Sequence, residues 1–444
     1  MPQQRPAFLN RRMLLAFVPA AVAIAGLSGS YMLPVDHEAI QYTRGPVDDP
    51  VARLQQRIDK GQVKLQYDDE FGYLRSVLKE LNVSTSSQVL VFSKTSFQAP
   101  KIAPRTPRAL YFNDFVTVGF VRTGDVLEFA ALDPKQGIMF YTLDQEHSSR
   151  PHFERRDVCL QCHQSGATMG VPGLLVRSVT PDHTGMPVMS AGGSITDHRS
   201  PFKERWGGWY VTGTSGTQTH MGNAVLQNPT DDERAPISEG TSNVTDLNRY
   251  IDAGAWPTPH SDIVALMTLE HQTQMENLIT RVGWETRMAL YENAAINRSL
   301  GEPEDKLRES VEHRINSAVE DLLDYMLFRD EARLTAPVKG TSGFSEEFQK
   351  SGLRDSKGRS LRDFDLKTRM FRYPCSFLIY SEAFDSMPAP ARDRVYQRLW
   401  DVLAGKDNNP RFAYLAPDDR KAILEILLAT KKGLPEYWHA SLSD

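Results

Sequence analysis

The stretch "FVTVGFVRTGDVLEFAAL" (residues 115–132) decides the fold class of this chain. It contains two runs rich in valine, phenylalanine and leucine, separated by "TGD" (123–125), a sequence typical of a tight turn. β-Branched and aromatic side chains suit the pleated surface of a sheet. The stretch therefore predicts two strands, and "GIMFYTLD" (137–144) predicts a third strand after a turn at residues 134–137.

The pattern changes on both sides of this β-rich stretch. Residues 31–107 contain two short helical patterns (51–60 and 72–81), a strand-like "QVLVFS" (88–93) and a proline-spaced linker (99–107). Residues 108–260 are rich in strands, glycine and turns. From residue 261 to 444 the apolar spacing is helical, with predicted helices at 261–282, 284–297, 304–329, 388–404 and 417–431. We therefore predict an α+β fold in which a β-containing region is followed by a mainly α-helical C-terminal half.

Residues 1–30 have the pattern of an export signal. Arg5, Arg11 and Arg12 form a positive segment, and the apolar run "MLLAFVPAAVAIAGL" (13–27) follows and ends in small residues. An uncleaved membrane anchor is the alternative, although the run is near the short limit of about 17 residues for a membrane span and contains Pro19. We expect the protein to be periplasmic or secreted, or anchored to the membrane by this segment.

Composition limits the classes of partner. The chain of 444 residues is long enough for two or three packed units, and its apolar fraction of 40% supports ordinary cores. The formal net charge is -5, and the basic residues form no dense run. A nucleic-acid partner is therefore not expected.

The three cysteines are placed unevenly. Cys159 and Cys162 lie in "RRDVCLQCHQSG" (155–166), whereas Cys375 lies in an apolar run and is predicted to be a buried free thiol. In an exported chain, a close pair of cysteines forms a disulfide, binds a metal or is used in covalent chemistry. A thioredoxin-like pair starts a helix, but the segment that follows is rich in glycine and proline. A zinc site needs four ligands, and the sequence nearby has no second CxxC or HxxxH.

The remaining interpretation uses all three residues of the motif. Cys159, Cys162 and His163 form a Cys-x-x-Cys-His sequence, the pattern of covalent haem attachment. Over these five residues, and in its export signal, the chain resembles the c-type cytochromes. The resemblance implies one covalently attached haem c, with Cys159 and Cys162 as thioether anchors and His163 as the proximal iron ligand.

The rest of the chain departs from the familiar small cytochromes. Those domains are helical, about a hundred residues long, and carry the motif near the amino terminus. Here the motif follows a β-rich segment, so a minimal all-α cytochrome fold is not expected. A single CxxCH also differs from di-haem peroxidases and multi-haem reductases, and it limits the expected number of haem groups to one.

Three residues are candidates for the distal side of the iron. Eight of the eleven histidines lie between residues 147 and 271, which indicates a chemical centre in that window. In "TQTHMGN" (217–223), His220 and Met221 lie in a glycine-flanked loop about sixty residues beyond His163, a separation that resembles the distance to the distal methionine in small cytochromes. His271 lies on the apolar stripe of a predicted helix and is expected to point inward. The alternative for each histidine is an ordinary hydrogen-bonded residue.

Two classes of function follow. The first is an electron carrier with a six-coordinate haem, which exchanges electrons with a redox partner protein or a small-molecule donor or acceptor. The second is a mono-haem oxidoreductase, such as a peroxidase, in which His220 or His271 works over an open distal site. A haem sensor or a subunit of a respiratory complex is a further alternative. Chain length favours the enzyme, whereas the absence of a recognisable distal motif favours the carrier.

Overall fold

The computed structural model describes residues 32–226, 240–407 and 409–440. The predicted export signal at residues 1–30 lies outside the described residues. Within the described ranges, no helix is both long enough and apolar enough to cross a membrane.

One antiparallel sheet forms the N-terminal half of the fold. The sheet has seven strands in the order β6-β5-β4-β3-β2-β1-β9, so its first six strands form a meander and β9 is added beside β1. The three strands predicted from residues 115–132 and 137–144 are confirmed as β3, β4 and β5. The strands of this sheet are β1 (Val89–Val91), β2 (Arg108–Phe112), β3 (Val116–Val121), β4 (Val126–Asp133), β5 (Gly137–Asp144), β6 (Phe153–Arg155) and β9 (Trp209–Tyr210). A separate hairpin pairs β7 (Val176–Val179) with β8 (Gly193–Thr196).

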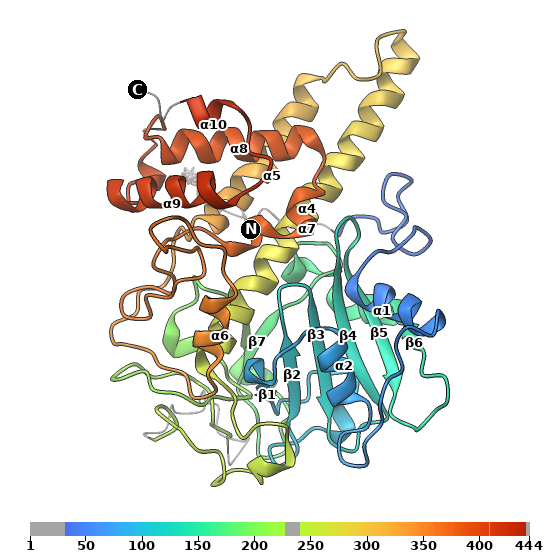
Figure 1. The fold of residues 1–444 in the computed structure, drawn as a ribbon, viewed down its shortest axis with the longest axis vertical. Coiled ribbons are helices and arrows are strands. Elements are labelled where there is room, and N and C mark those ends of the chain that lie inside the picture. The colour runs from blue at the N-terminus through green and yellow to red at the C-terminus, as the bar shows by residue number, and fades with distance from the viewer. Residues whose placement is uncertain (1–31, 227–239, 408, 441–444) are drawn as a thin grey trace, which may run out of the picture.

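Strand residues alternate between two hydrophobic cores, one on each face of the sheet. On β4, Leu127 and Phe129 face the first core, which also includes residues of α1 (Pro50–Asp59) and α2 (Leu74–Glu80). Ala130 and Leu132 face the second core, which they share with the C-terminal helices. The sheet is therefore the middle layer of the molecule, between α1 and α2 on one side and α4 on the other (Figure 1).

The long helix α4 (Ile263–Leu300) connects the sheet to the helical half. Its N-cap is Asp262, whose carboxylate oxygen Oδ1 accepts hydrogen bonds from the backbone N–H groups of Val264 and Ala265. The other oxygen accepts from the N–H groups of Thr341 and Ser342, so a distant loop is tied to the same residue. With 38 residues, α4 is about 57 Å long and forms a projecting hairpin with α5 (Figure 1).

The remaining helices pack around α4 and α5. The described C-terminal helices are α5 (Glu309–Met326), α6 (Phe344–Lys350), α7 (Glu382–Asp385), α8 (Ala389–Leu403), α9 (Pro417–Thr430) and α10 (Tyr437–Ala440). The predicted α+β class is confirmed, with strands before residue 211 and long helices after residue 262. The predicted helices at 388–404 and 417–431 correspond closely to α8 and α9.

The predicted helix break at Gly283 is wrong, because α4 continues through it. A glycine costs a helix about 1 kcal/mol relative to alanine, and this cost is outweighed by the buried side chains on both sides, such as Ile279 and Trp284. The sheet also extends across residue 107, the predicted end of the N-terminal segment, because β1 pairs with β2 and β9.

Candidate functional site

The Cys-x-x-Cys-His motif forms a short helical turn directly after the edge strand β6. A 3-10 turn (Asp157–Cys159) leads into α3 (Leu160–His163), so the motif is continuously helical. Residues three apart on a helix share a face. Cys159 and Cys162 therefore lie on the same side of the turn. Both are free thiols: Cys159 is half-buried against the second core and Cys162 is exposed.

The imidazole of His163 is held in one orientation by the backbone. Its Nδ1 lies 2.9 Å from the carbonyl oxygen of Gly173, and its ring centroid lies 4.9 Å from that of Phe140 on β5. A carbonyl oxygen can only accept, so Nδ1 carries the proton, and in the neutral ring Nε2 carries the lone pair. Among the described residues, Nε2 has no hydrogen-bond partner. Metal-binding histidines use this arrangement, in which one nitrogen donates to a carbonyl and the other is free to ligate.

Helix α4 fixes the carbonyl that orients His163. The side-chain amide of Asn277 donates to the carbonyl oxygen of Leu174 at 2.7 Å and accepts from the N–H of Leu174 at 3.1 Å. The segment passes so close to α4 that a Cβ atom on Gly173 would lie 2.1 Å from Oδ1 of Asn277. A side chain at residue 173 would therefore push the segment away from α4 and disturb its contact with His163.

The electrostatic environment keeps the motif neutral. Burial lowers the pKa of His163, although its bond to the Gly173 carbonyl opposes this effect. Burial also raises the pKa of the Cys159 thiol. At neutral pH the turn therefore presents an uncharged imidazole with a free lone pair and an uncharged half-buried thiol. These donors fit the covalent attachment of a haem, which needs two unpaired thiols on one side and one free imidazole nitrogen.

His271, a distal candidate, is buried in a different part of the fold. It precedes Asn277 by six residues, which places it about 9 Å farther along α4. Both of its ring nitrogens have partners: Nδ1 lies 2.9 Å from Nδ1 of His198, and Nε2 lies 2.8 Å from Oγ of Ser376. The expectation that His271 points inward is confirmed, since the residue has 0% exposure.

His198, His271 and Ser376 form a chain of hydrogen bonds in which each donor can be assigned. The His198 Nε2 atom is buried without a partner among the described residues. An unpaired buried N–H costs more than an unpaired lone pair, so His198 is expected to carry its proton on Nδ1 and donate it to His271. His271 then donates from Nε2 to Ser376. Burial lowers the pKa of His271 to about 3, although the negative charge of Asp197 opposes this effect.

The other two distal candidates lie in the loop beside β7. His220 is 1% exposed, its Nδ1 accepts a hydrogen bond from the N–H of Gly222 at 3.1 Å, and its ring lies 5.2 Å from Trp206. Burial lowers the pKa of His220 to about 4. Met221 is half-buried, with its sulfur 3.7 Å from Oγ of Ser178. No contact between His163 and His220, Met221 or His271 occurs in the described structure, so the distal ligand stays a prediction.

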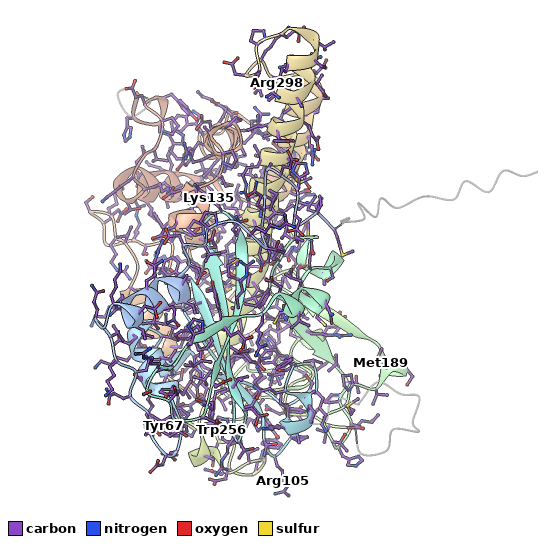
Figure 2. The ribbon with its side chains drawn as sticks, turned by 90° about the vertical axis from the view of Figure 1, so that its right-hand side faces the viewer. Tyr67, Arg105, Lys135, Met189, Trp256 and Arg298 are labelled. Carbon is purple, nitrogen blue, oxygen red and sulfur yellow. The ribbon has the colours of Figure 1, made fainter. Side chains whose placement is uncertain are left out.

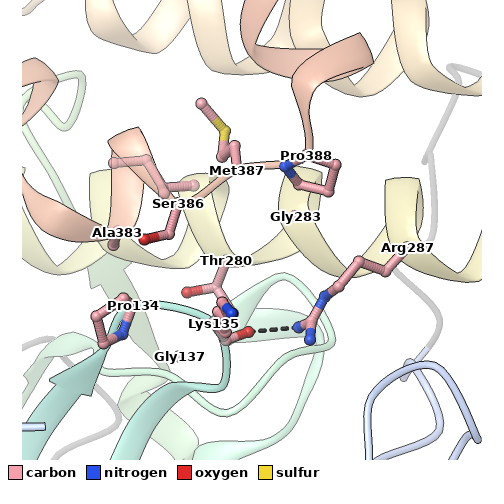
Figure 3. A pocket seen from close by; sticks show the side chains of 11 residues that line it. Pro134, Lys135, Gly137, Thr280, Gly283, Arg287, Ala383, Ser386, Met387 and Pro388 are labelled. Carbon is pink, nitrogen blue, oxygen red and sulfur yellow. Dashed lines mark hydrogen bonds between the residues drawn. The ribbon is translucent and has the colours of Figure 1, made fainter. Parts of the chain in front are cut away.

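Two concave sites lie beside the turns that connect strands β4, β5 and β6. A cavity of about 20 Å³, room for about one water molecule, lies between the β4–β5 turn, α4 and the connection from α7 to α8 (Figure 3). The Arg287 guanidinium donates to the carbonyl oxygen of Lys135 beside it. A surface cleft of about 220 Å³ lies beside the β5–β6 loop and is lined by Asp144, Glu146, Arg150, His152 and Glu154. Both are smaller than the 300 Å³ or more that is typical of pockets for small molecules.

The structure adds candidate site residues that the sequence analysis did not find. Gly173 orients His163, Asn277 fixes Gly173, and an ion pair between Arg108 and Glu128 lies on the neighbouring sheet face. The sequence signal for Gly173 was the glycine-rich "GVPG" (170–173) after the motif. No local signal identifies the other three residues, because their contacts depend on strand register and on the path of α4.

In the part of the chain that the structure describes, no group of three or more His, Cys, Asp or Glu side chains is arranged to hold a metal ion. No protein-family model, curated protein or solved structure matches the chain. The functional assignment therefore depends on the motif and its geometry.

Proposed function

We propose that this protein is an exported mono-haem c-type cytochrome that acts in electron transfer. One observation carries the proposal: in a turn with two free thiols on one side, the His163 Nδ1 proton is held by the Gly173 carbonyl and Nε2 is left without a partner. His271, a histidine of the helical core, has a partner for each nitrogen. The pattern at His163 is instead typical of a metal ligand.

Each residue of the turn has a definite role in this proposal. Cys159 and Cys162 would hold the haem through two thioether bonds, and each thiol proton would pass to the vinyl group that the sulfur joins. Nε2 of His163 would ligate the iron. The bound haem supplies one-electron chemistry. Gly173 and Asn277 keep the imidazole in place, and the exposed position of Cys162 leaves one side of the turn accessible to a redox partner protein or a small electron donor or acceptor.

The positions of the distal candidates favour a second function, a mono-haem oxidoreductase or sensor with an open distal site. Both nitrogens of His271 are engaged, and Nδ1 of His220 accepts from a backbone N–H. Ligation by His271 would break one of two buried hydrogen bonds. An iron without a sixth protein ligand binds small molecules, whereas a carrier keeps both axial positions filled.

An optical spectrum separates these alternatives. The purified protein is reduced with dithionite and measured with and without carbon monoxide. A c-type spectrum that carbon monoxide leaves unchanged supports the electron carrier, and one that shifts supports the open site. A protein expressed with the haem-attachment machinery that retains no haem after denaturation would overturn both.

Export needs its own test, because the signal at residues 1–30 is an inference from sequence. We expect fractionation of a bacterial expression host to recover the protein outside the cytoplasm. A variant lacking residues 1–30 is expected to stay in the cytoplasm without covalent haem. Recovery of haem-bearing protein from the cytoplasm in both cases would contradict the export proposal.

A further inference from the structure

The sheet face beside the Cys159–His163 turn carries an ion pair that spans three strands. Arg108 on β2 and Glu128 on β4 meet across β3, with 2.6 Å between Nη2 and Oε2. Adjacent strands are about 4.8 Å apart, so the two side chains together bridge about 10 Å of sheet. The side chains are 21% and 14% exposed, so water screens this pair less than it screens a surface pair.

Gly119 of β3 makes this bridge possible. In the strand register, Gly119 lies directly opposite Glu128 and two residues from the partner of Arg108. A Cβ atom on Gly119 would lie 2.8 Å from Nη2 and 2.9 Å from Nε of Arg108. The guanidinium therefore rests on the bare backbone of Gly119, and any larger residue would move it.

Further hydrogen bonds fix the position of Glu128. Its Oε1 accepts from the Gln98 amide at 3.0 Å and from the Ser96 hydroxyl at 3.2 Å. Arg108 is less fully satisfied, because its buried Nε has no acceptor among the described residues. The Glu128 carboxylate is therefore fixed by several hydrogen bonds. The Arg108 guanidinium is fixed mainly by Glu128 and by its packing against the backbone of Gly119.

A short path of contacts links the ion pair to the motif. Glu128 lies directly opposite Thr142 on β5, and Thr142 accepts from Nε of Arg156 at 2.9 Å. The N–H of Cys159 in turn donates to the carbonyl oxygen of Arg156. The ion pair is therefore connected to the turn through Thr142 and Arg156.

We propose that the Arg108–Glu128 ion pair, laid across Gly119 beside the Cys159–His163 turn, sets the reduction potential of the attached haem. This inference rests on the proposed function. Loss of an electron leaves one more positive charge at the site, so Arg108 disfavours the oxidised state and Glu128 favours it. Arg108 thus raises the reduction potential and Glu128 lowers it. The positions of the two charges, which Gly119 fixes, determine the net shift.

The test is a spectroscopic redox titration of the haem-loaded full chain and three variants. Arg108→Gln is expected to lower the potential and Glu128→Gln to raise it, each changing the ratio of reduced to oxidised protein about tenfold at a fixed ambient potential. Tenfold corresponds to about 59 mV for a one-electron couple. Gly119→Ala changes no charge, but it displaces Arg108 and is expected to lower the potential by a smaller amount.

The chain offers a matched control pair. Arg298 and Glu304 form an exposed ion pair at the far end of the α4–α5 hairpin, with 2.9 Å between Nε and Oε1 (Figure 2). Arg298→Gln and Glu304→Gln make the same charge changes far from the motif and are expected to leave the potential unchanged.

The outcomes distinguish the inference from the function on which it rests. If the wild type carries covalent haem but the Arg108 and Glu128 variants shift the potential in the same direction, or do not shift it, the inference is overturned. If the wild type carries no haem, the proposed function fails. A change in stability alone would not move the two potentials in opposite directions. If Arg108→Gln does not fold, Glu128→Gln and Gly119→Ala still give opposite expected shifts.

Discussion

His163 and His271 show two different uses of the same side chain. His163 lies half-buried on a short turn, donates one proton to a backbone carbonyl and has a free Nε2. His271 lies inside the helical half, stacks against Phe328 at 4.4 Å, and has a partner for each nitrogen. The first arrangement leaves a lone pair that can bind a metal ion. In the second, both ring nitrogens form hydrogen bonds within the core.

The surroundings of the two histidines explain the difference. Around His271, the ion pair between Arg205 and Glu270 is 3% and 0% exposed, and Arg205 also donates to the carbonyl oxygen of His198. Breaking such a buried network is costly, so we assign His271 a structural role. The turn around His163 has an exposed cysteine beside it, and the His163 ring contacts Phe140 and forms one hydrogen bond, to Gly173. A reactive site is therefore expected at the less satisfied of the two histidines.

The largest expected effect concerns the thiols beside His163. The double variant Cys159→Ser, Cys162→Ser is expected to lose all covalently retained haem, because a hydroxyl does not form the thioether bond. Haem staining after denaturing electrophoresis measures the retention. Cys375→Ala is the control: Cys375 is 0% exposed in the helical core, and its loss is expected to leave the haem attached. Haem that survives denaturation in the double variant would contradict the attachment proposal.

The two histidine variants sharpen the comparison directly. His271→Ala leaves a cavity and removes a hydrogen-bond partner from both His198 and Ser376, so it is expected to lower the free energy of unfolding by about 3 kcal/mol. His163→Ala is expected to lower it by only about 1 kcal/mol and to change the haem spectrum. Chemical denaturation and optical spectra measure the two effects.

His313→Ala is the matched control for both variants, because the His313 side chain is 74% exposed on α5. It is expected to change neither the stability nor the spectrum. A spectral change at His271→Ala as large as that at His163→Ala would show that His271 also acts at the haem.

The sequence predicted the elements whose signals are local. Strands β3, β4 and β5 follow from two runs of apolar residues and their turns, and the inward position of His271 follows from its helical stripe. Strand β9 has only two residues and β8 reads "GSIT", with too few apolar side chains to give a pattern. Gly283 predicted a break because a local penalty cannot be weighed against tertiary burial before the fold is known.

The candidate site divides in the same way. Cys159, Cys162 and His163 could be predicted because the whole pattern spans five residues. Asn277 and the Arg108–Glu128 pair could not, because only the packing of α4 and the register of the sheet bring them near the motif. The sequence therefore predicted the candidate ligands but not the residues that hold or surround them in the fold.

Acid is expected to destabilise the cluster of His198 and His271. Their pKa values are low in the folded protein, about 3 for His271, and near 6.5 when unfolded. Between these values the unfolded chain binds more protons, so stability falls as the pH falls from 6.5 toward 3. Each histidine contributes a slope of up to about 1.4 kcal/mol per pH unit.

The free energy of unfolding, measured against pH for the wild type and His271→Gln, checks this expectation. The variant lacks one of the two titrating rings, so its slope between pH 4 and pH 6 is expected to be shallower by about 1 kcal/mol per unit. His220, whose pKa burial lowers to about 4, titrates in both proteins and cancels in the difference. Equal slopes would show that His271 is protonated in the folded state.

The smallest effect on stability is expected at Glu276, which lies on α4 between His271 and Asn277, the residue that fixes Gly173. Burial raises the pKa of Glu276 to about 8, although its hydrogen bond from Gln272 at 2.9 Å opposes this effect. The folded state then binds more protons than the unfolded state between pH 4.5 and pH 8, so Glu276 lowers stability as the pH rises through that window. Glu276→Gln removes this loss, so its gain in stability over the wild type is expected to be larger at pH 8 than at pH 5. Glu292→Gln, at an exposed position of the same helix, is the control and is expected to show no such pH dependence. A gain at Glu276 that is equal at both pH values would mean that the carboxyl is not protonated in the fold, and that its burial adds nothing to the pH response of α4.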